Sequence, residues 1–257
     1  MGKQIIGIDI GGTKITGIVF NGSVVLDELT IITPKTFFEF ERNLFKLVDF
    51  LSAKNKIAGI GIGIAGLANP KTGIIRVTHN AKFKASLNLV KLFKNKYGLP
   101  VKIDNDAACF TRAEMFVGQG RGLNNFLGIT LGTGIGGGIV INKKIYRGSD
   151  NSGGEFGQMA LDKGLLETRY FQPARQSNNY KALGQILGRT FATLINFFAP
   201  DAIILGGGLT KNAGNKFLGS AKKEMKKFLY NEKAVPVILT SKLKNAGAIG
   251  AALLFKK

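Results

Sequence analysis

The sequence predicts an α/β protein made of two related domains that face a cleft. Both halves of the 257-residue chain open with a buried strand, a glycine-rich turn and a return strand. Apolar residues make up 45% of the chain, which is enough for a sizeable core. We place the domains at 1–107 and 108–257, with the C-terminal helix as a candidate to return to the first domain.

The first half is predicted to be an antiparallel meander followed by alternating helices and strands. Asn21-Gly22 lies between two apolar runs and is a strong hairpin signal, while Gly98 and Pro100 end a helix. The expected strands are 4–10, 15–20, 24–29, 57–65 and 101–103, and the expected helices are 36–54, 87–97 and 107–117.

The second half repeats this plan from Asn125 onward. A strand leads into a glycine-rich turn, and a return strand ends at a turn at Asn142-Lys143. The expected strands are 126–131, 138–141, 202–205 and 235–239, and the expected helices are 180–198, 222–229 and 246–255. This internal echo is the main reason to expect two related domains.

Composition limits the cellular setting and the metals that the chain can bind. No stretch reaches the ~18 apolar residues of a membrane span, and the single cysteine, Cys109, fits a reducing cytoplasm. A cysteine-rich zinc site is excluded, because Cys109 and His79 are the only residues of their types. The net charge of +20 has no accompanying aromatic or arginine pattern, so we expect neither a nucleic-acid nor a membrane partner.

Two glycine motifs do not fit the common nucleotide-binding fingerprints. Gly132-Thr133-Gly134 follows a strand but continues into a second strand, whereas a dinucleotide fingerprint opens a helix. No segment has the glycine and lysine spacing of a P-loop. Neither a dinucleotide site nor a P-loop is supported.

A turn with bare glycines between two strands can still bind phosphate. Backbone N–H groups in a tight turn form an anion site, and the missing Cβ atoms let oxygens approach. Asp9 before the first turn is a candidate to hold Mg²⁺ through water, and Thr13 and Thr133 offer hydroxyls to phosphate. The alternative is that each turn is a hairpin that needs glycine for a positive φ. The presence of one such turn in each half favours phosphate.

Asp104-Asn105-Asp106 stands at the carboxyl end of an expected strand. Asp106 is a candidate general base that accepts the proton of an attacking hydroxyl, and Asn105 is a candidate to bind neighbouring hydroxyls. The alternative is that acids and Asn at a strand end are ordinary turn or N-cap formers, and that Asp106 only caps the helix behind it.

Taken in order, the motifs resemble the ROK family (repressor, open reading frame, kinase), within the actin/hexokinase-like (ribonuclease H-like) ATPase superfamily. The resemblance spans nearly the whole chain. It rests on the segments Gly7–Lys14, Asp104–Phe110, Leu131–Gly138, Gly154–Gly157, Gly164–Thr168, Leu205–Gly208 and Asn245–Ala252.

The resemblance implies an ATP- and Mg²⁺-dependent kinase of a hexose or N-acetylhexosamine, and a homodimer. It makes Asp106 the catalytic base. It places sugar ligands at Asn80, Asn105, Glu155, Gln158 and Glu167. It places phosphate and nucleoside contacts at Gly11, Gly12, Thr13, Lys14, Gly132, Thr133, Gly134, Gly207 and Gly208, with Asp9 at the metal.

One departure from the family pattern concerns the sugar site. The family usually has a histidine that binds both zinc and sugar, followed by a cysteine-rich zinc loop; here Gln158 stands in its place and the stretch 159–166 has no cysteine. The two losses agree with each other, and the Gln158 amide can still bind a sugar hydroxyl. We therefore expect no zinc.

Two alternatives to an ATP-dependent kinase remain open. Related enzymes without zinc include some that use inorganic polyphosphate, which a basic chain would attract. A non-catalytic sugar sensor is the other class, although the first strand at Gln4 leaves no room for the N-terminal helix-turn-helix of ROK repressors.

Overall fold

The computed structural model describes residues 2–77, 87–233 and 235–256. Its contacts divide the chain into two compact units. Unit 1 contains Met1–Gly118, Arg147–Ser152 and Leu243–Lys257, and unit 2 contains Gln119–Tyr146 and Gly153–Lys242. The predicted domain limits, 1–107 and 108–257, and the predicted cleft stay predictions.

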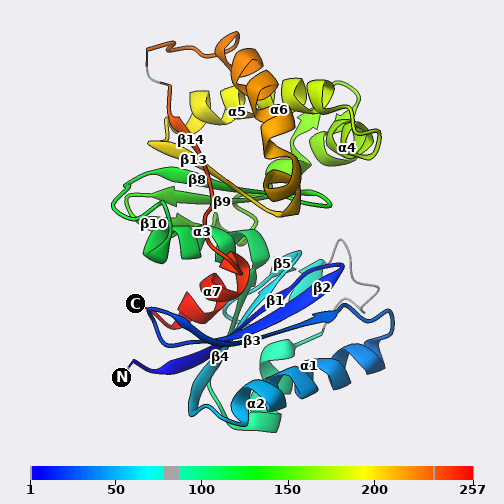
Figure 1. The fold of residues 1–257 in the computed structure, drawn as a ribbon, viewed down its shortest axis with the longest axis vertical. Helices are drawn as coiled ribbons and strands as arrows, with labels where there is room; N and C mark the ends of the chain where they lie inside the picture. The colour runs from blue at the N-terminus through cyan, green and yellow to red at the C-terminus, as the bar shows by residue number, and fades with distance from the viewer. Residues whose placement is uncertain (1, 78–86, 234, 257) are drawn as a thin grey trace. The chain divides into compact units, whose positions relative to one another are not determined.

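Unit 1 is built on a five-stranded sheet that contains β1, β2, β3 and β4 (Figure 1). Its strand order is β3-β2-β1-β4-β7. The first three strands are antiparallel, and β4 and β7 join β1 in parallel. The elements are β1 (Gln4–Ile10), β2 (Lys14–Phe20), β3 (Val25–Ile32), α1 (Phe37–Ser52), β4 (Ile57–Ile64), β5 (Leu67–Ala68), β6 (Ile75–Val77), α2 (Leu89–Tyr97), β7 (Val101–Asn105), α3 (Asp106–Val117), α7 (Ala246–Ala252) and η3 (Leu253–Phe255).

Unit 2 repeats that strand order as β10-β9-β8-β13-β14, again with an antiparallel meander followed by two parallel strands. The elements are β8 (Phe126–Leu131), β9 (Ile135–Ile141), β10 (Lys144–Tyr146), η1 (Phe156–Gln158), β11 (Ala160–Leu161), β12 (Gly164–Leu165), η2 (Leu166–Phe171), α4 (Gln172–Gln176), α5 (Tyr180–Phe198), β13 (Ala202–Gly206), α6 (Gly208–Lys226) and β14 (Val237–Thr240). The shared order confirms the mixed α/β fold with two related sheets.

Local signals in the sequence explain several element boundaries. Helix α1 begins after Thr36, whose hydroxyl accepts a hydrogen bond from the Glu39 backbone N–H. Helix α2 ends at Gly98, which adopts the left-handed conformation expected at a helix C-terminus. The turn at Asn142 and Lys143 has positive φ at both residues, as a two-residue hairpin turn requires.

Two elements begin at least three residues before the position that the sequence pattern predicted. Helix α6 begins at Gly208, whereas the apolar periodicity predicted a helix only from 222. Strand β9 begins at Ile135 rather than at 138. In both cases the missed residues include glycines, whose weak intrinsic preference is overridden by packing.

Close packing of α7 on the first sheet explains the glycines in two strands. A Cβ on Gly7 would lie 2.0 Å from the carbonyl oxygen of Ala248, and one on Gly61 would lie 1.9 Å from that of Ala251. On its other side α7 meets α3, because a Cβ on Gly250 would lie 1.7 Å from the Cys109 carbonyl oxygen. Figure 1 shows this short helix beside the strands of unit 1.

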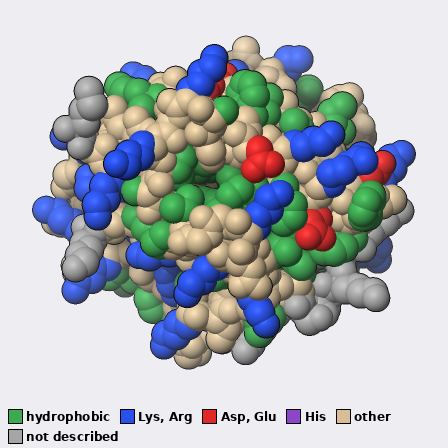
Figure 2. Space-filling view, turned by 90° about the horizontal axis from the view of Figure 1, so that it is seen from below, with side chains coloured by type: hydrophobic (Ala, Val, Ile, Leu, Met, Phe, Trp, Pro, Cys, Tyr) green, Lys and Arg blue, Asp and Glu red, His purple; other side chains and the backbone are tan. Residues whose placement is uncertain are grey.

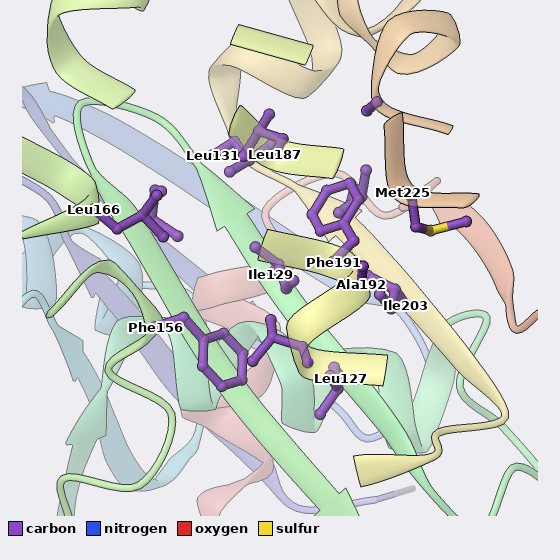
Figure 3. Packing of buried hydrophobic residues seen from close by; sticks show 14 of the residues in the cluster. Leu127, Ile129, Leu131, Phe156, Leu166, Leu187, Phe191, Ala192, Ile203 and Met225 are labelled. Carbon is purple, nitrogen blue, oxygen red and sulfur yellow. The ribbon is translucent and has the colours of Figure 1, made fainter. Parts of the chain in front are cut away.

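Each unit has its own hydrophobic core. In unit 1, α1 contributes Phe40 and Leu44 to a cluster with the isoleucines of β1 and β4. In unit 2, α5 and α6 cover the second sheet, and Phe191 packs with strand residues such as Leu127 and Ile203 (Figure 3). Phe156 and Leu166 belong to this same core, and both immediately neighbour predicted site residues.

The surface is basic without a single concentrated patch on the face drawn in Figure 2, where Lys and Arg side chains are scattered among polar and apolar ones. Within the described residues, no helix combines the length and the apolar character needed to cross a bilayer.

Candidate active site

The carboxyl ends of the parallel strands in unit 1 bring the predicted acidic residues together. The register places Asp9 of β1 opposite Gly63 of β4, and Gly63 opposite Asp104 of β7. Gly63, at the centre of this row, lets the start of α3 pack closely on β4. A Cβ at this position would lie only 3.2 Å from Cys109 Sγ and 3.7 Å from Asp106 Cα. Asp106 therefore stands within one strand spacing of the row that contains Asp9.

Asn105 and Asp106 form the start of α3. Asn105 is the N-cap: its Oδ1 accepts a hydrogen bond from the Ala108 N–H at 3.0 Å, and its Nδ2 donates to the Gly66 carbonyl oxygen at 3.2 Å. One N–H and one lone pair of the amide remain for a ligand. Asp106 is half-buried, and its Oδ1 accepts a hydrogen bond from the Ala107 N–H at 2.8 Å. The helix cap is therefore Asn105 and not Asp106, and the Asn105 amide keeps capacity for a second role.

Asp104 is a buried anchor behind these two residues, and its partners were not predicted from the sequence. It is 1% exposed, and Arg147 donates to both of its carboxylate oxygens. The guanidinium of Arg112 lies 3.8 Å from the same carboxylate. Burial and the charge of Asp104 raise the pKa of the neighbouring Cys109 thiol, so this cysteine is a neutral core residue.

Asp9 is half-buried at the end of β1, next to the first turn of α7. A Cβ on Gly247 would lie 2.4 Å from Asp9 Oδ2, so the carboxylate packs directly on the helix backbone. Burial, followed by the negative charge of Asp106, raises the pKa of Asp9 to about 7, against a smaller lowering by Lys14. A cation bound beside Asp9 would relieve both effects.

The first glycine turn presents an open edge to solvent. Gly12, Thr13 and Lys14 are exposed, and the turn is closed by the Gly11 N–H, which donates to the Lys14 carbonyl oxygen at 3.1 Å. The Thr33 hydroxyl donates to the Gly11 carbonyl oxygen at 2.7 Å. Gly11 does not have a positive φ, so the hairpin alternative does not explain this glycine.

The second glycine turn divides into an open and a packed part. Gly132 does not have a positive φ, and no described atom lies within 4 Å of a Cβ built on it. Gly134 is different, because a Cβ there would lie 2.0 Å from Glu167 Oε2. The fold requires glycine at 134 for packing, while at 132 the fold imposes no such requirement and a ligand can approach.

Three predicted sugar ligands gather around the beginning of β9. Glu155 precedes η1 and Gln158 ends it, and both are half-buried. The loop that carries them packs on β9, since a Cβ on Gly137 would lie 2.3 Å from the Gly154 carbonyl oxygen and from the Phe156 ring. Glu167 Oε2 accepts a hydrogen bond of 2.7 Å from the Ile135 N–H.

The glycine triplet Gly206-Gly207-Gly208, at the end of β13, lies beside the second glycine turn. Gly207 has φ +88° and approaches the end of β8 so closely that a Cβ would lie 2.3 Å from the Leu131 carbonyl oxygen. Gly208 begins the 19-residue helix α6, and no described atom lies within 4 Å of a Cβ built there. The N-terminus of a long helix thus opens beside the second turn, a position that favours anions.

Unit 1 therefore brings together Asp9, the first turn, Asn105 and Asp106, and unit 2 brings together the second turn, Glu155, Gln158, Glu167 and the triplet. Asn80, the remaining predicted sugar ligand, and His79 lie outside the described residues. Among the described residues, no three His, Cys, Asp or Glu side chains form a metal-binding group. One carboxylate such as Asp9, with water and substrate phosphates, is nevertheless a donor set that Mg²⁺ accepts.

Comparisons with known proteins give the family of the chain and similar solved structures. The sequence profile of the ROK family matches residues 5–174 and 166–257. A β-glucoside kinase of Listeria monocytogenes is 29% identical and is aligned over 98% of this chain and 97% of its own length. The ROK family glucokinase of Streptomyces griseus, solved in complex with glucose and AMPPNP, superimposes with a TM-score of 0.86 at 26% identity, covering 98% of both chains. An inorganic polyphosphate/ATP-glucomannokinase from Arthrobacter sp. strain KM superimposes with a TM-score of 0.81 at 28% identity, also covering 98% of both.

Proposed function

The chain belongs to the ROK family, and from this premise we propose that it is a sugar kinase that transfers the terminal phosphoryl group of ATP to a hydroxyl of a hexose. The observation that carries the proposal is the position of Asp106. Its carboxylate starts α3 at the carboxyl ends of the parallel strands, where it acts electrostatically on Asp9 beside the first glycine turn. A proton acceptor and a phosphate-binding turn are the two parts that this reaction needs.

Asp106 accepts the proton of the attacking hydroxyl as the oxygen approaches phosphorus. Such base catalysis typically contributes ~10²–10⁴ in rate. Asn105 orients the acceptor with the part of its amide that the helix cap leaves available. The Arg147–Asp104 pair holds the strand end on which both residues stand.

The donor phosphates bind the two glycine turns, Gly11–Lys14 and Gly132–Gly134. Open space over Gly132 and Gly208 and the N-terminus of α6 support this assignment. Asp9 would hold Mg²⁺, which when bound would supply positive charge near the transferred group.

The acceptor binds Glu155, Gln158 and Glu167, which the fold gathers around the start of β9. Asn80 completes the set by family resemblance. Because Gln158 is neutral and has both a donor and an acceptor, it fits a sugar hydroxyl in either direction. We further propose that the protein is cytoplasmic and forms a homodimer, and light scattering of the purified protein would test the dimer.

Polyphosphate is the second candidate donor. It is supported by the similarity to an enzyme that uses both donors and by the net charge of +20, which attracts a polyanion. A coupled assay measures sugar phosphate formed from glucose, a β-glucoside or N-acetylglucosamine with either ATP or polyphosphate. Turnover with any pair supports a kinase and identifies the donor. Sugar binding without turnover would contradict the proposed activity and favour a sensor.

A further inference from the structure

Glu167 makes a contact that a sugar ligand alone does not require. Its Oε2 accepts the Ile135 N–H at 2.7 Å, and Ile135 directly follows the second glycine turn. The bare Gly134 fits against the same carboxylate, because a Cβ there would lie 2.0 Å from Oε2 and 3.0 Å from Oε1. The carboxylate of Glu167 is therefore in close packing with the backbone of the turn Gly132–Gly134.

The backbone around Glu167 is fixed from both sides. Leu166 is completely buried in the core of unit 2 (Figure 3), as is Phe171. The Leu166 N–H donates to the Met159 carbonyl oxygen at 2.8 Å. Between them the chain forms a π-helical turn, η2, a rare conformation that is frequent at functional sites. Glu167 thus has little freedom to leave the turn.

The short hairpin β11–β12 adds a third support at the stretch where the family usually has its zinc loop. The Tyr170 hydroxyl, from η2, accepts a hydrogen bond from the Lys163 N–H at 2.9 Å and donates to Asp162 at the tip of the hairpin. Arg169 donates to the Lys163 carbonyl oxygen at 3.1 Å. These side-chain hydrogen bonds join η2 to the tip of the β11–β12 hairpin.

We propose that Glu167 is a positioning residue for the second glycine turn, in addition to contacting the sugar: its Oε2 fixes the backbone to which the donor phosphates bind, while its Oε1 faces the acceptor. Oε1 makes no hydrogen bond to the described residues. The inference rests on the proposed function, because it assumes that the turn binds phosphate. It assigns one carboxylate to both substrates, so that its loss affects the donor even when no sugar is present.

Two variants separate this role from sugar binding. In Glu167→Gln the side-chain oxygen can still accept the Ile135 N–H, although the charge is lost. In Glu167→Ala nothing replaces the acceptor. Glu232→Ala, which changes an exposed glutamate of unit 2, is the matched control.

The first measurement is hydrogen exchange at the Ile135 amide in the free protein. We expect exchange at least about tenfold faster in Glu167→Ala, since an amide that loses its acceptor loses its protection, and nearly wild-type exchange in Glu167→Gln and the control. The second is the affinity for AMPPNP with Mg²⁺ and without sugar, expected to weaken about five- to tenfold only in Glu167→Ala.

Unchanged exchange and donor affinity in Glu167→Ala would overturn the inference, as would equal losses in Glu167→Gln and Glu167→Ala. A wild-type protein that binds no nucleotide and phosphorylates no hexose would instead contradict the proposed function. The amide exchange would still decide whether Glu167 positions the turn.

Discussion

Arg147 donates to both carboxylate oxygens of Asp104, which is 1% exposed and lies two residues before the proposed base. The two residues are 43 positions apart in the sequence. The pair joins the segment Arg147–Ser152 to the end of β7, the strand that leads to Asn105 and Asp106.

Removing the arginine should destabilise the protein strongly. Arg147→Met leaves the buried Asp104 with Arg112 at 3.8 Å as its remaining cation among the described residues, beside the hydrogen bond from the Asn105 N–H. Uncompensated buried charges of this kind typically cost about 3 kcal/mol or more. Urea unfolding measures the loss, and Arg121→Met, at an exposed position, should change the free energy of unfolding by less than about 0.5 kcal/mol. Similar stabilities of the two variants would contradict the anchoring role.

The raised pKa of Asp9 predicts a pH-dependent stability. The folded protein keeps a proton on Asp9 up to about pH 7, whereas the unfolded chain releases it near the ordinary value of 3.8. The folded state therefore binds more protons in this window, and stability falls as pH rises through it. Asp9→Asn stays neutral and should lack this fall.

Because Asp9 is partly exposed, solvent screens the effect, and we expect Asp9→Asn to gain about 1–2 kcal/mol over wild type between pH 5 and pH 8. Urea unfolding in buffers without divalent cations checks this. Addition of Mg-ATP should reverse the trend for the wild type only, since the ion favours ionised Asp9. An equal stability difference at both pH values would contradict the raised pKa.

Asp106→Asn should abolish turnover while nucleotide binding persists. The amide keeps the size of the side chain but cannot accept the proton, and the expected loss in kcat is at least about 10². Steady-state rates and AMPPNP titration measure the two properties. Retention of more than about a tenth of the wild-type rate would show that Asp106 is not the base.

Gly132→Ala tests the phosphate assignment of the second turn. No described atom lies within 4 Å of the new methyl group, so thermal stability should be close to that of the wild type. The methyl group occupies the open space proposed for phosphate, and the KM for the donor should rise about tenfold through weakened backbone hydrogen bonds. An unchanged donor KM would place the phosphates elsewhere.

Two glycine substitutions should have opposite effects on stability. Gly61→Ala places a Cβ 1.9 Å from the Ala251 carbonyl oxygen and should cost at least about 2 kcal/mol by forcing α7 from the sheet. Gly219→Ala lies in α6 with no described atom within 4 Å, so the helix should gain about 0.5–1 kcal/mol. Thermal denaturation compares them, and destabilisation by both would show that packing does not explain the difference.

The sequence by itself determined the order of the longer strands and helices and the repeated plan of the two halves. Alternation of apolar residues, the cap at Thr36 and the stops at Gly98 and Pro100 act over a few residues, so they can be read without coordinates. It also predicted the family and the role of Asp106, because the motifs are short stretches of sequence whose order along the chain can be compared directly.

Only the tertiary structure decided which glycines the fold requires and which side chains hold the site. Gly132 and Gly134 look alike in the sequence, yet one faces open space and the other packs on Glu167. The pairing of Arg147 with Asp104 joins segments far apart in the chain and gives no local signal. Such contacts depend on three-dimensional packing, and neither composition nor spacing encodes them.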